Sequence, residues 1–124
     1  MSRRRVVVTG LGIVCPVGIG VESTWRGIVE GKSGIGPIAQ FDASTFPTRI
    51  AGEVKGFEAE KYMDKREVRR NDRFIHFAMA AGEMAMKDSG LDMAKEDPER
   101  VGAIIGAGMG GLATVEETHK TFPR

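Results

Sequence analysis

The chain has 124 residues, 17 of them glycine, and a formal net charge of +1. This length suits one domain of ordinary size. The near-neutral charge argues against a dedicated nucleic-acid-binding protein, and an apolar content of 41% is too high for a disordered chain. The single cysteine excludes an intrachain disulfide framework and is typical of a reducing compartment. No segment approaches the ~20 apolar residues of a membrane helix, so we expect a cytoplasmic protein that is not bound to membranes.

The first third of the chain begins with a β-branched segment. Residues 5–9 form a continuous apolar run, which is typical of a strand covered on both faces. Residues 22–30 predict a short amphipathic helix that ends at Gly31. Residues 32–48 contain glycine and proline without periodicity and predict a loop.

The middle of the chain contains the longest helix signal. Residues 49–54 alternate weakly and predict an edge strand or hairpin arm, and residues 58–63 predict one helical turn. Residues 72–89 carry apolar side chains at helical spacing over a broad surface, which is typical of a helix buried between layers. Gly90 is the expected C-cap of this helix.

The last third repeats the pattern of a strand followed by glycines. Residues 101–105 predict a second buried strand, the glycine-rich loop (residues 106–111) follows, and residues 112–120 predict a helix. The order strand, helix, helix, strand, helix favours a layered α/β fold with a parallel sheet.

The glycine-rich loop fits the spacing of a dinucleotide-binding fingerprint through Gly106, Gly108 and Gly111. The acidic residue that would support this function should lie about 20 residues further on, but the sequence ends at Arg124. A lone fingerprint also matches by chance in a glycine-rich chain. A tight structural turn is therefore the preferred interpretation.

Three further side chains are candidates for catalytic groups or metal ligands. Cys15 lacks a neighbouring helix N-terminus or base that would lower its pKa, so the sequence predicts a buried, inert thiol. His76 and His119 have no second ligand at metal-binding spacing. No catalytic set of Ser, His and Asp or of Cys and His can be assembled.

A basic run precedes and enters the long predicted helix. Five basic residues fall within nine positions: Lys65, Arg66, Arg69, Arg70 and Arg73. The four arginines are three or four positions apart or adjacent, so one helix would place them on one face. Such a face could bind a phosphate or an acidic protein, and a merely solvated charged face fits the pattern equally well.

Several motifs occur in an order that resembles one enzyme family. They span residues 4–12, 16–18, 30–35, 41–42, 51–54, 85–91 and 106–111. Together they resemble the N-terminus of the β-ketoacyl-[acyl carrier protein] synthases, with a spacing closer to synthase II of type II fatty-acid synthesis than to synthase I. The resemblance covers the whole of residues 1–124.

This resemblance implies a thiolase-like α-β-α-β-α sandwich, usually a homodimer, of which residues 1–124 form part of the N-terminal half. Such enzymes are acyltransferases that condense malonyl units on acyl carrier protein with an acyl chain and release CO₂, without a cofactor. Their acyl-carrying Cys and two assisting His lie in later segments. Cys15, His76 and His119 match none of these positions, so we expect residues 1–124 alone to be inactive.

The resemblance also assigns two binding features. Arg66, Arg69 and Arg70, the arginine cluster, match the positions that receive acyl carrier protein, and guanidinium groups suit an acidic, phosphate-bearing partner. Met109 matches the residue that borders and gates the acyl pocket, a role that suits a flexible apolar side chain. The alternatives are a non-catalytic carrier-protein-binding or chain-length-factor-like module, and a dinucleotide-binding domain that uses the Gly106–Gly111 loop.

Overall fold

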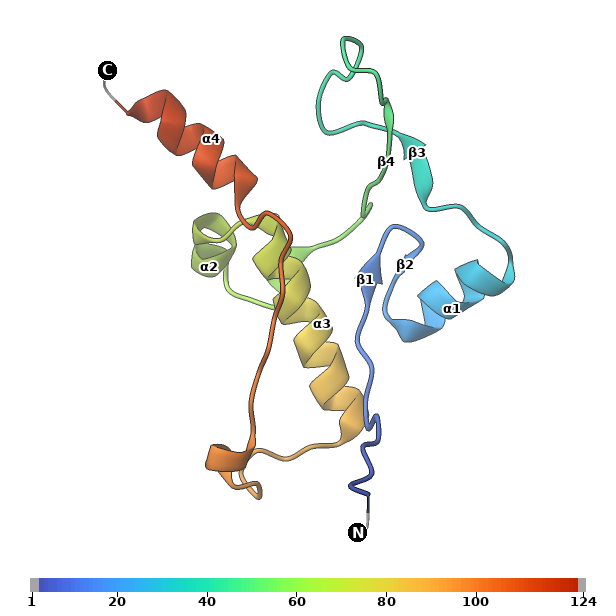
Figure 1. Ribbon diagram of the computed structural model, residues 1–124, viewed down its shortest axis with the longest axis vertical. Coiled ribbons are helices and arrows are strands. Elements are labelled where there is room, and N and C mark those ends of the chain that lie inside the picture. The colour runs from blue at the N-terminus through green and yellow to red at the C-terminus, as the bar shows by residue number, and fades with distance from the viewer. Residues whose placement is uncertain (1–2, 123–124) are drawn as a thin grey trace.

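The computed structural model describes residues 3–122, in which four α-helices and two small antiparallel sheets are arranged around a central helix (Figure 1). The helices are α1 (Val21–Val29), α2 (Lys65–Arg70), α3 (Arg73–Ser89) and α4 (Leu112–Thr121). Two short 3₁₀ helices are η1 (Ala59–Lys61) and η2 (Pro98–Arg100). These elements confirm the helices predicted over residues 22–30, 72–89 and 112–120 and the helical turn predicted within residues 58–63.

Two hairpins supply the strands of the described residues. Strand β1 (Val14–Cys15) pairs with β2 (Gly18–Ile19), and β3 (Ile35–Pro37) pairs with β4 (Ile50–Gly52), both antiparallel. The hairpin arm predicted within residues 49–54 is therefore confirmed. Strand β3 lies inside the predicted loop, because its three residues are too few to show an alternating pattern.

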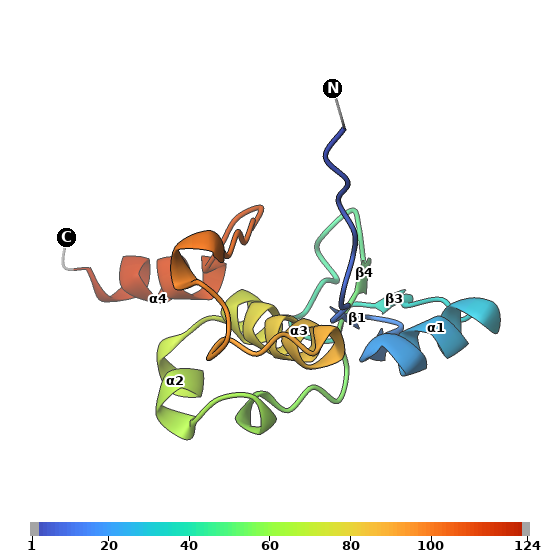
Figure 2. The same cartoon turned by 90° about the horizontal axis from the view of Figure 1, so that it is seen from below.

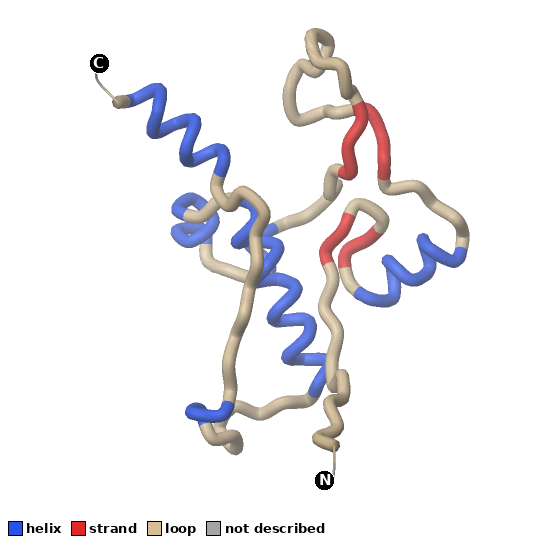
Figure 3. The backbone as a smooth tube through the Cα atoms, viewed as in Figure 1, coloured by secondary structure: helices blue, strands red, loops and turns tan. Residues whose placement is uncertain are grey.

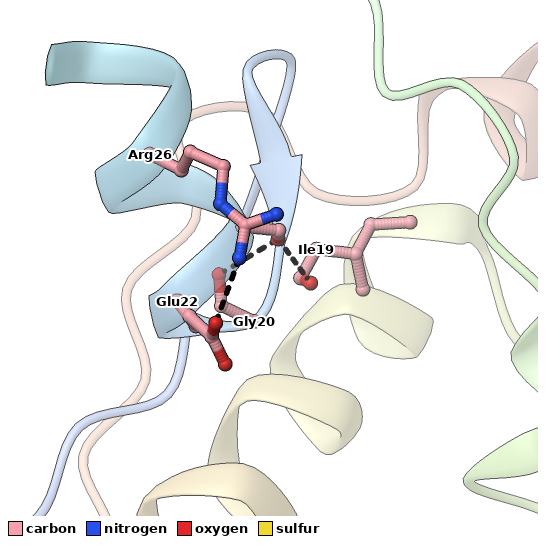
Figure 4. Close-up of polar contacts among 5 residues, drawn as sticks. Ile19, Gly20, Glu22 and Arg26 are labelled. Atoms are coloured by element: carbon pink, nitrogen blue, oxygen red, sulfur yellow. Dashed lines mark hydrogen bonds and ion pairs between the residues drawn. The ribbon is translucent and has the colours of Figure 1, made fainter. Parts of the chain in front are cut away.

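Helix α1 is held by local contacts at its first turn. The Arg26 guanidinium forms a salt bridge of 2.8 Å with Glu22, one turn earlier (Figure 4). The Ser23 hydroxyl donates to the carbonyls of Ile19, at 2.6 Å, and Gly20, at 3.2 Å. These bonds satisfy carbonyls of the turn that joins β2 to α1, so the helix starts at a fixed place.

Helix α3 is the central element and ends as predicted at Gly90, which has a left-handed φ of 66°. The segment that leads into β1 packs closely on it, because a Cβ atom built on Gly12 would lie 2.7 Å from the Ala85 backbone nitrogen. The prediction that α3 is buried between layers is wrong for the described residues. Ala80 is buried, but Met79 remains 52% exposed, since only part of the broad apolar surface is covered.

The two predicted strands, residues 5–9 and 101–105, are extended but unpaired within residues 3–122. They run in the same direction along either side of α3, which runs the opposite way (Figures 1 and 3). Val6 is 94% and Ile104 100% exposed. The predicted parallel sheet is thus wrong for this part of the chain, because an extended segment becomes a strand only beside a second backbone that satisfies its N–H and C=O groups.

The arrangement is open, as the view from below also shows (Figure 2). Its accessible surface is 10719 Å² for 13.4 kDa, whereas a folded monomer of this mass exposes roughly 6,500 Å². Many large apolar side chains are exposed, including Val7, Trp25 and Phe122. Among the helices of residues 3–122, none is long and apolar enough to cross a membrane.

Candidate functional site

The arginine cluster lies on α2, a short helix that is fixed at both ends. At its start, the Asp64 carboxylate accepts hydrogen bonds from the backbone N–H groups of Arg66, at 2.8 Å, and Glu67, at 2.9 Å. At its end, the Asn71 side-chain amide donates to the Glu67 carbonyl at 2.9 Å. Six residues alone would not hold a helix in water, so these caps are what fixes the spacing of the arginines.

Arg66, Arg69 and Arg70 are all exposed, and they lie on one side of α2 because Arg69 and Arg70 follow Arg66 by three and four residues. Within residues 3–122, none of the three forms a salt bridge, whereas the neighbouring Lys65 pairs with Glu60 at 3.7 Å. The last turn of a helix is also where cations are favoured by the helix dipole. The cluster therefore offers three guanidinium groups to an external anion.

Arg73 does not belong to this cluster, which corrects the prediction of a four-arginine face on one helix. The chain leaves the helical conformation at Asn71 and Asp72, so Arg73 begins α3. Its guanidinium donates to the Val54 carbonyl at 2.6 Å and lies 5.2 Å from the centre of the Phe77 ring. Arg73 thus holds the segment after β4 against α3.

The glycine-rich loop forms one wall of an apolar groove of about 500 Å³. Met109, at the tip of the loop, is 79% exposed. The other walls are residues of α3 and the segment that leads into β1: Gly12, Ile13, Val14, Phe74, Phe77, Ala78 and Ala81. The structure thus brings Met109 together with an apolar face of α3 and places it beside a space that an alkyl chain could occupy.

Asp72 is a site residue that the sequence reasoning missed. Its carboxylate oxygen Oδ2 accepts a hydrogen bond of 3.4 Å from the backbone N–H of Thr114, in the first turn of α4, and lies against Gly111. An Asp before a helix signals a cap for that helix, and nothing in the sequence indicates that its side chain reaches 42 residues away.

This contact argues against dinucleotide binding at the loop. A bound pyrophosphate needs free N–H groups and positive potential at the helix N-terminus. Here a carboxylate already accepts from the first turn of α4. A phosphate at the same place would face its negative charge, and the close packing of Gly111 on Asp72 gives this last glycine of the motif a structural reason.

Cys15 is half-buried in β1 rather than buried, and its Sγ lies 3.7 Å from the Thr24 hydroxyl oxygen. Burial raises the pKa of the thiol, but hydrogen bonds from the Val17 backbone, the Thr24 hydroxyl and the Gly18 backbone outweigh it and lower the pKa below its ordinary value. The prediction from sequence considered only a helix N-terminus or a base, so it missed the backbone and hydroxyl donors that lower this pKa. A turn beside a cysteine gives no sequence signal, because its N–H groups converge only after folding.

Alkylation should report this lowered pKa. We expect iodoacetamide to modify Cys15 with a midpoint pH below that of the same thiol in the urea-unfolded chain, and Thr24→Val to raise the folded midpoint. The rate is followed by mass spectrometry of the peptide that contains Cys15. Because the folded state favours the thiolate, its stabilising contribution exists above the unfolded pKa and is lost as pH falls through the folded pKa. A folded midpoint at or above the unfolded one would contradict the assignment.

The two histidines have structural environments. His76 is half-buried, and its Nε2 donates to the Val68 carbonyl at 3.1 Å, which ties α3 to α2. His119 is exposed on α4. Across residues 3–122, no group of three or more His, Cys, Asp and Glu side chains is placed to hold a metal ion.

Comparison with known proteins identifies close relatives of the whole chain. Residues 3–123 match the family model described as "Beta-ketoacyl synthase, N-terminal domain". The 3-oxoacyl-[acyl-carrier-protein] synthase 2 of Vibrio cholerae is 50% identical over 98% of this chain, and that of Vibrio harveyi is 51% identical over 98%. The chain spans only about 30% of the length of these relatives.

Solved structures show the same kinship. A ketosynthase in complex with its type II PKS acyl-carrier protein, bound to the hexaketide, superposes with a TM-score of 0.75 at 31% identity, over 95% of this chain and 30% of that chain. The ishigamide ketosynthase/chain length factor gives a TM-score of 0.67 at 38% identity, over 75% of this chain and 23% of that chain. The overall path of most of this chain therefore has experimentally determined counterparts.

Proposed function

The chain belongs to the β-ketoacyl synthase family through the N-terminal domain of that family, and on this premise we propose that it is part of a 3-oxoacyl-[acyl carrier protein] synthase of fatty-acid elongation. Its reaction is the decarboxylative condensation of a malonyl unit with an acyl chain, both held on acyl carrier protein. The observation that carries the proposal is the sequence identity to such synthases, which is 50–51% over 98% of this chain.

The arginine cluster and the groove have different binding functions in this domain. Acyl carrier protein is acidic, and its prosthetic arm bears a phosphate, so the guanidinium groups of α2 suit its docking. The groove beside Met109 accepts the apolar acyl chain by burying it. The arginine cluster thus binds the carrier protein, and the groove binds the acyl chain that the carrier holds. The catalytic Cys and His are assigned to segments outside residues 1–124, so the domain supplies binding and orientation.

The fold that we propose for the assembled enzyme is the thiolase-like α-β-α-β-α sandwich, with residues 1–124 in its N-terminal half and a homodimer as the functional unit. Residues 5–9 and 101–105 support this proposal, because they are rich in β-branched side chains, extended, parallel in direction and unpaired within residues 3–122. In the assembled sheet, neighbouring strands would satisfy their backbone groups and cover Val6 and Ile104.

An assay of the enzyme that carries this domain tests the function. Acyl and malonyl thioesters of acyl carrier protein are supplied together, and CO₂ and the 3-oxoacyl product are measured. We expect the two products in equal amounts. Release of CO₂ without chain extension, or no reaction at all, would contradict the proposal of a condensing enzyme.

A second candidate is a non-catalytic module of the chain-length-factor type, because one of the similar solved structures contains a chain length factor as well as a ketosynthase. The two candidates share docking on α2 and differ in the catalytic cysteine. Reading the gene beyond the codon for Arg124 separates them. A Thr-Ala-Cys-type segment supports the synthase, and a substituted cysteine supports the module.

Met109→Trp should shorten the acyl chains that the enzyme accepts. The indole would fill part of the groove next to Phe74 and α3, so we expect kcat/KM for long acyl chains to fall at least about tenfold, while short chains are spared. Kinetics with carrier-bound acyl chains of increasing length give the measurement. Met93→Trp, an exposed position outside the groove, is the control. An equal loss at every chain length would remove the pocket role of Met109.

A further inference from the structure

Asp72 uses its backbone and its side chain for different helices. Its carbonyl accepts the first hydrogen bond of α3, from the Ile75 N–H at 2.9 Å. Its side chain makes no cap on α3. Asp64 shows the usual case at the start of α2, where the carboxylate accepts from N–H groups of its own helix. The Asp72 carboxylate is therefore available for another partner.

That partner is the start of α4. The N-cap of α4 is Gly111, which has no side chain to offer, and the Asp72 carboxylate accepts from Thr114 N–H in its place. Negative charge is favoured at a helix N-terminus by the helix dipole. The contact is close, since a Cβ atom added to Gly111 would overlap the Asp72 carboxylate.

Asp72 is also close to α2 in the chain, and hydrogen bonds link α2 to the residues on either side of Asp72. It follows Arg70 by two residues, and Asn71 between them donates to the Glu67 carbonyl at 2.9 Å. His76, one turn into α3, donates to the Val68 carbonyl of α2 at 3.1 Å. Helix α2 and the start of α3 are therefore linked by side-chain hydrogen bonds, and Figure 1 shows that α4 begins beside this same end of α3.

The glycine-rich loop lies at the far end of this connection. Gly111 touches Asp72, and Met109 is two residues before it in the chain. Gly110 has a left-handed φ of 64°, so the short stretch between them adopts a conformation that favours glycine. A displacement of Asp72 therefore acts directly on the base of the loop, and the glycines allow its tip to respond.

We propose that Asp72 is a positioning residue that couples carrier-protein docking on α2 to the placement of Met109 beside the groove. The proposal rests on the proposed functions of the arginine cluster and Met109. A carrier that contacts Arg70 shifts α2, Asp72 transmits the shift to Gly111 and the first turn of α4, and the loop changes how far Met109 stands over the groove. Carrier docking and acyl-chain binding are then linked by a coupling free energy, so that each changes the affinity of the other.

A double-mutant cycle in the intact enzyme tests this coupling. The measured quantity is the Kd of acyl carrier protein that holds a long acyl chain through an amide, which cannot transfer. Arg70→Ala, Met109→Ala and their combination are compared. With Asp72 present, we expect the combined effect to depart from the product of the single effects by about fivefold or more. With Asp72→Ala, the departure should fall below about twofold.

Controls separate coupling from stability. Asp97→Ala removes an exposed capping carboxylate, which accepts from the Glu99 N–H at 3.1 Å and does not contact α4, and should leave the cycle unchanged. Gly111→Ala keeps Asp72 but displaces its carboxylate, so this variant should also abolish the coupling. It replaces Asp72→Ala in the experiment if Asp72→Ala does not fold.

The possible outcomes separate carrier docking on α2 from the role of Asp72. An unchanged Kd in Arg70→Ala would overturn docking on α2 and with it the proposed function of this surface. The role of Asp72 alone would be overturned if, with Asp72 present, the effects of Arg70→Ala and Met109→Ala on Kd simply multiplied. It would also be overturned if the coupling survived both Asp72→Ala and Gly111→Ala.

Discussion

Replacement of Arg66, Arg69 and Arg70 together by alanine is expected to weaken the binding of acyl carrier protein about 100-fold. The three guanidinium groups are free of salt bridges within residues 3–122. Exposed ion pairs contribute at most about 1 kcal/mol each, and at this upper end three of them account for about two powers of ten in Kd. The loss should fall on Kd and KM, with kcat at saturating carrier little changed.

Ionic strength gives this prediction a second readout. Salt screens exposed charges, so binding by the unaltered enzyme should weaken as salt rises, while the triple variant should respond weakly. Kd is measured by calorimetry at low and physiological ionic strength. Arg26→Ala is the matched control, because Arg26 is an exposed helical arginine that already pairs with Glu22. If the triple variant binds the carrier as tightly as the control, the carrier docks elsewhere.

Gly12→Ala is expected to destabilise the domain by about 3 kcal/mol or more, at the upper end of what overpacking costs. The added methyl group would overlap the Ala81 carbonyl oxygen and approach the Ala85 backbone nitrogen, 2.7 Å away. Backbone atoms of α3 cannot rotate aside as the end of a side chain can. The segment that leads into β1 would have to leave α3, and one wall of the groove would go with it.

Gly82→Ala is the matched control for this change. Gly82 lies in α3, the helix on which Gly12 packs, and a Cβ atom built on Gly82 meets nothing within 4 Å. Alanine is favoured over glycine in a helix by about 1 kcal/mol, so this variant should be equally stable or more stable. Urea unfolding of the intact enzyme provides the comparison. Equal stability of Gly12→Ala and the unaltered enzyme would show that the segment does not pack on α3 in the assembled protein.

Helices of this chain were predictable from sequence and the sheet was not. Residues 72–89 carry a long periodic pattern and a glycine stop, both of which are local signals, and α3 follows them closely. Residues 5–9 and 101–105 have strand composition, but pairing depends on a neighbouring backbone that local sequence does not specify. The extended conformation and common direction were therefore predictable, while the presence of a partner was not.

The site divides in the same way. Spacing places Arg66, Arg69 and Arg70 on one side of a helix, which α2 confirms. Spacing could not show that the helix ends before Arg73, since the interruption depends on Asn71 and Asp72 adopting extended conformations. The roles of Asp72 and Gly12 depend on contacts between residues far apart in the chain, and only the folded structure reveals them.

The unpaired segments on either side of α3 set a limit on engineering. Val7 and Ile105 are exposed apolar residues beside open rows of backbone N–H and C=O groups, a combination that invites edge-to-edge aggregation. A designer who wanted to produce this domain alone would first replace such residues with lysine or glutamate. In the proposed assembled sheet, however, these positions would be buried, so each solubilising substitution would place a charge where the enzyme needs a core. Production of the domain and assembly of the enzyme therefore make opposite demands on the same side chains.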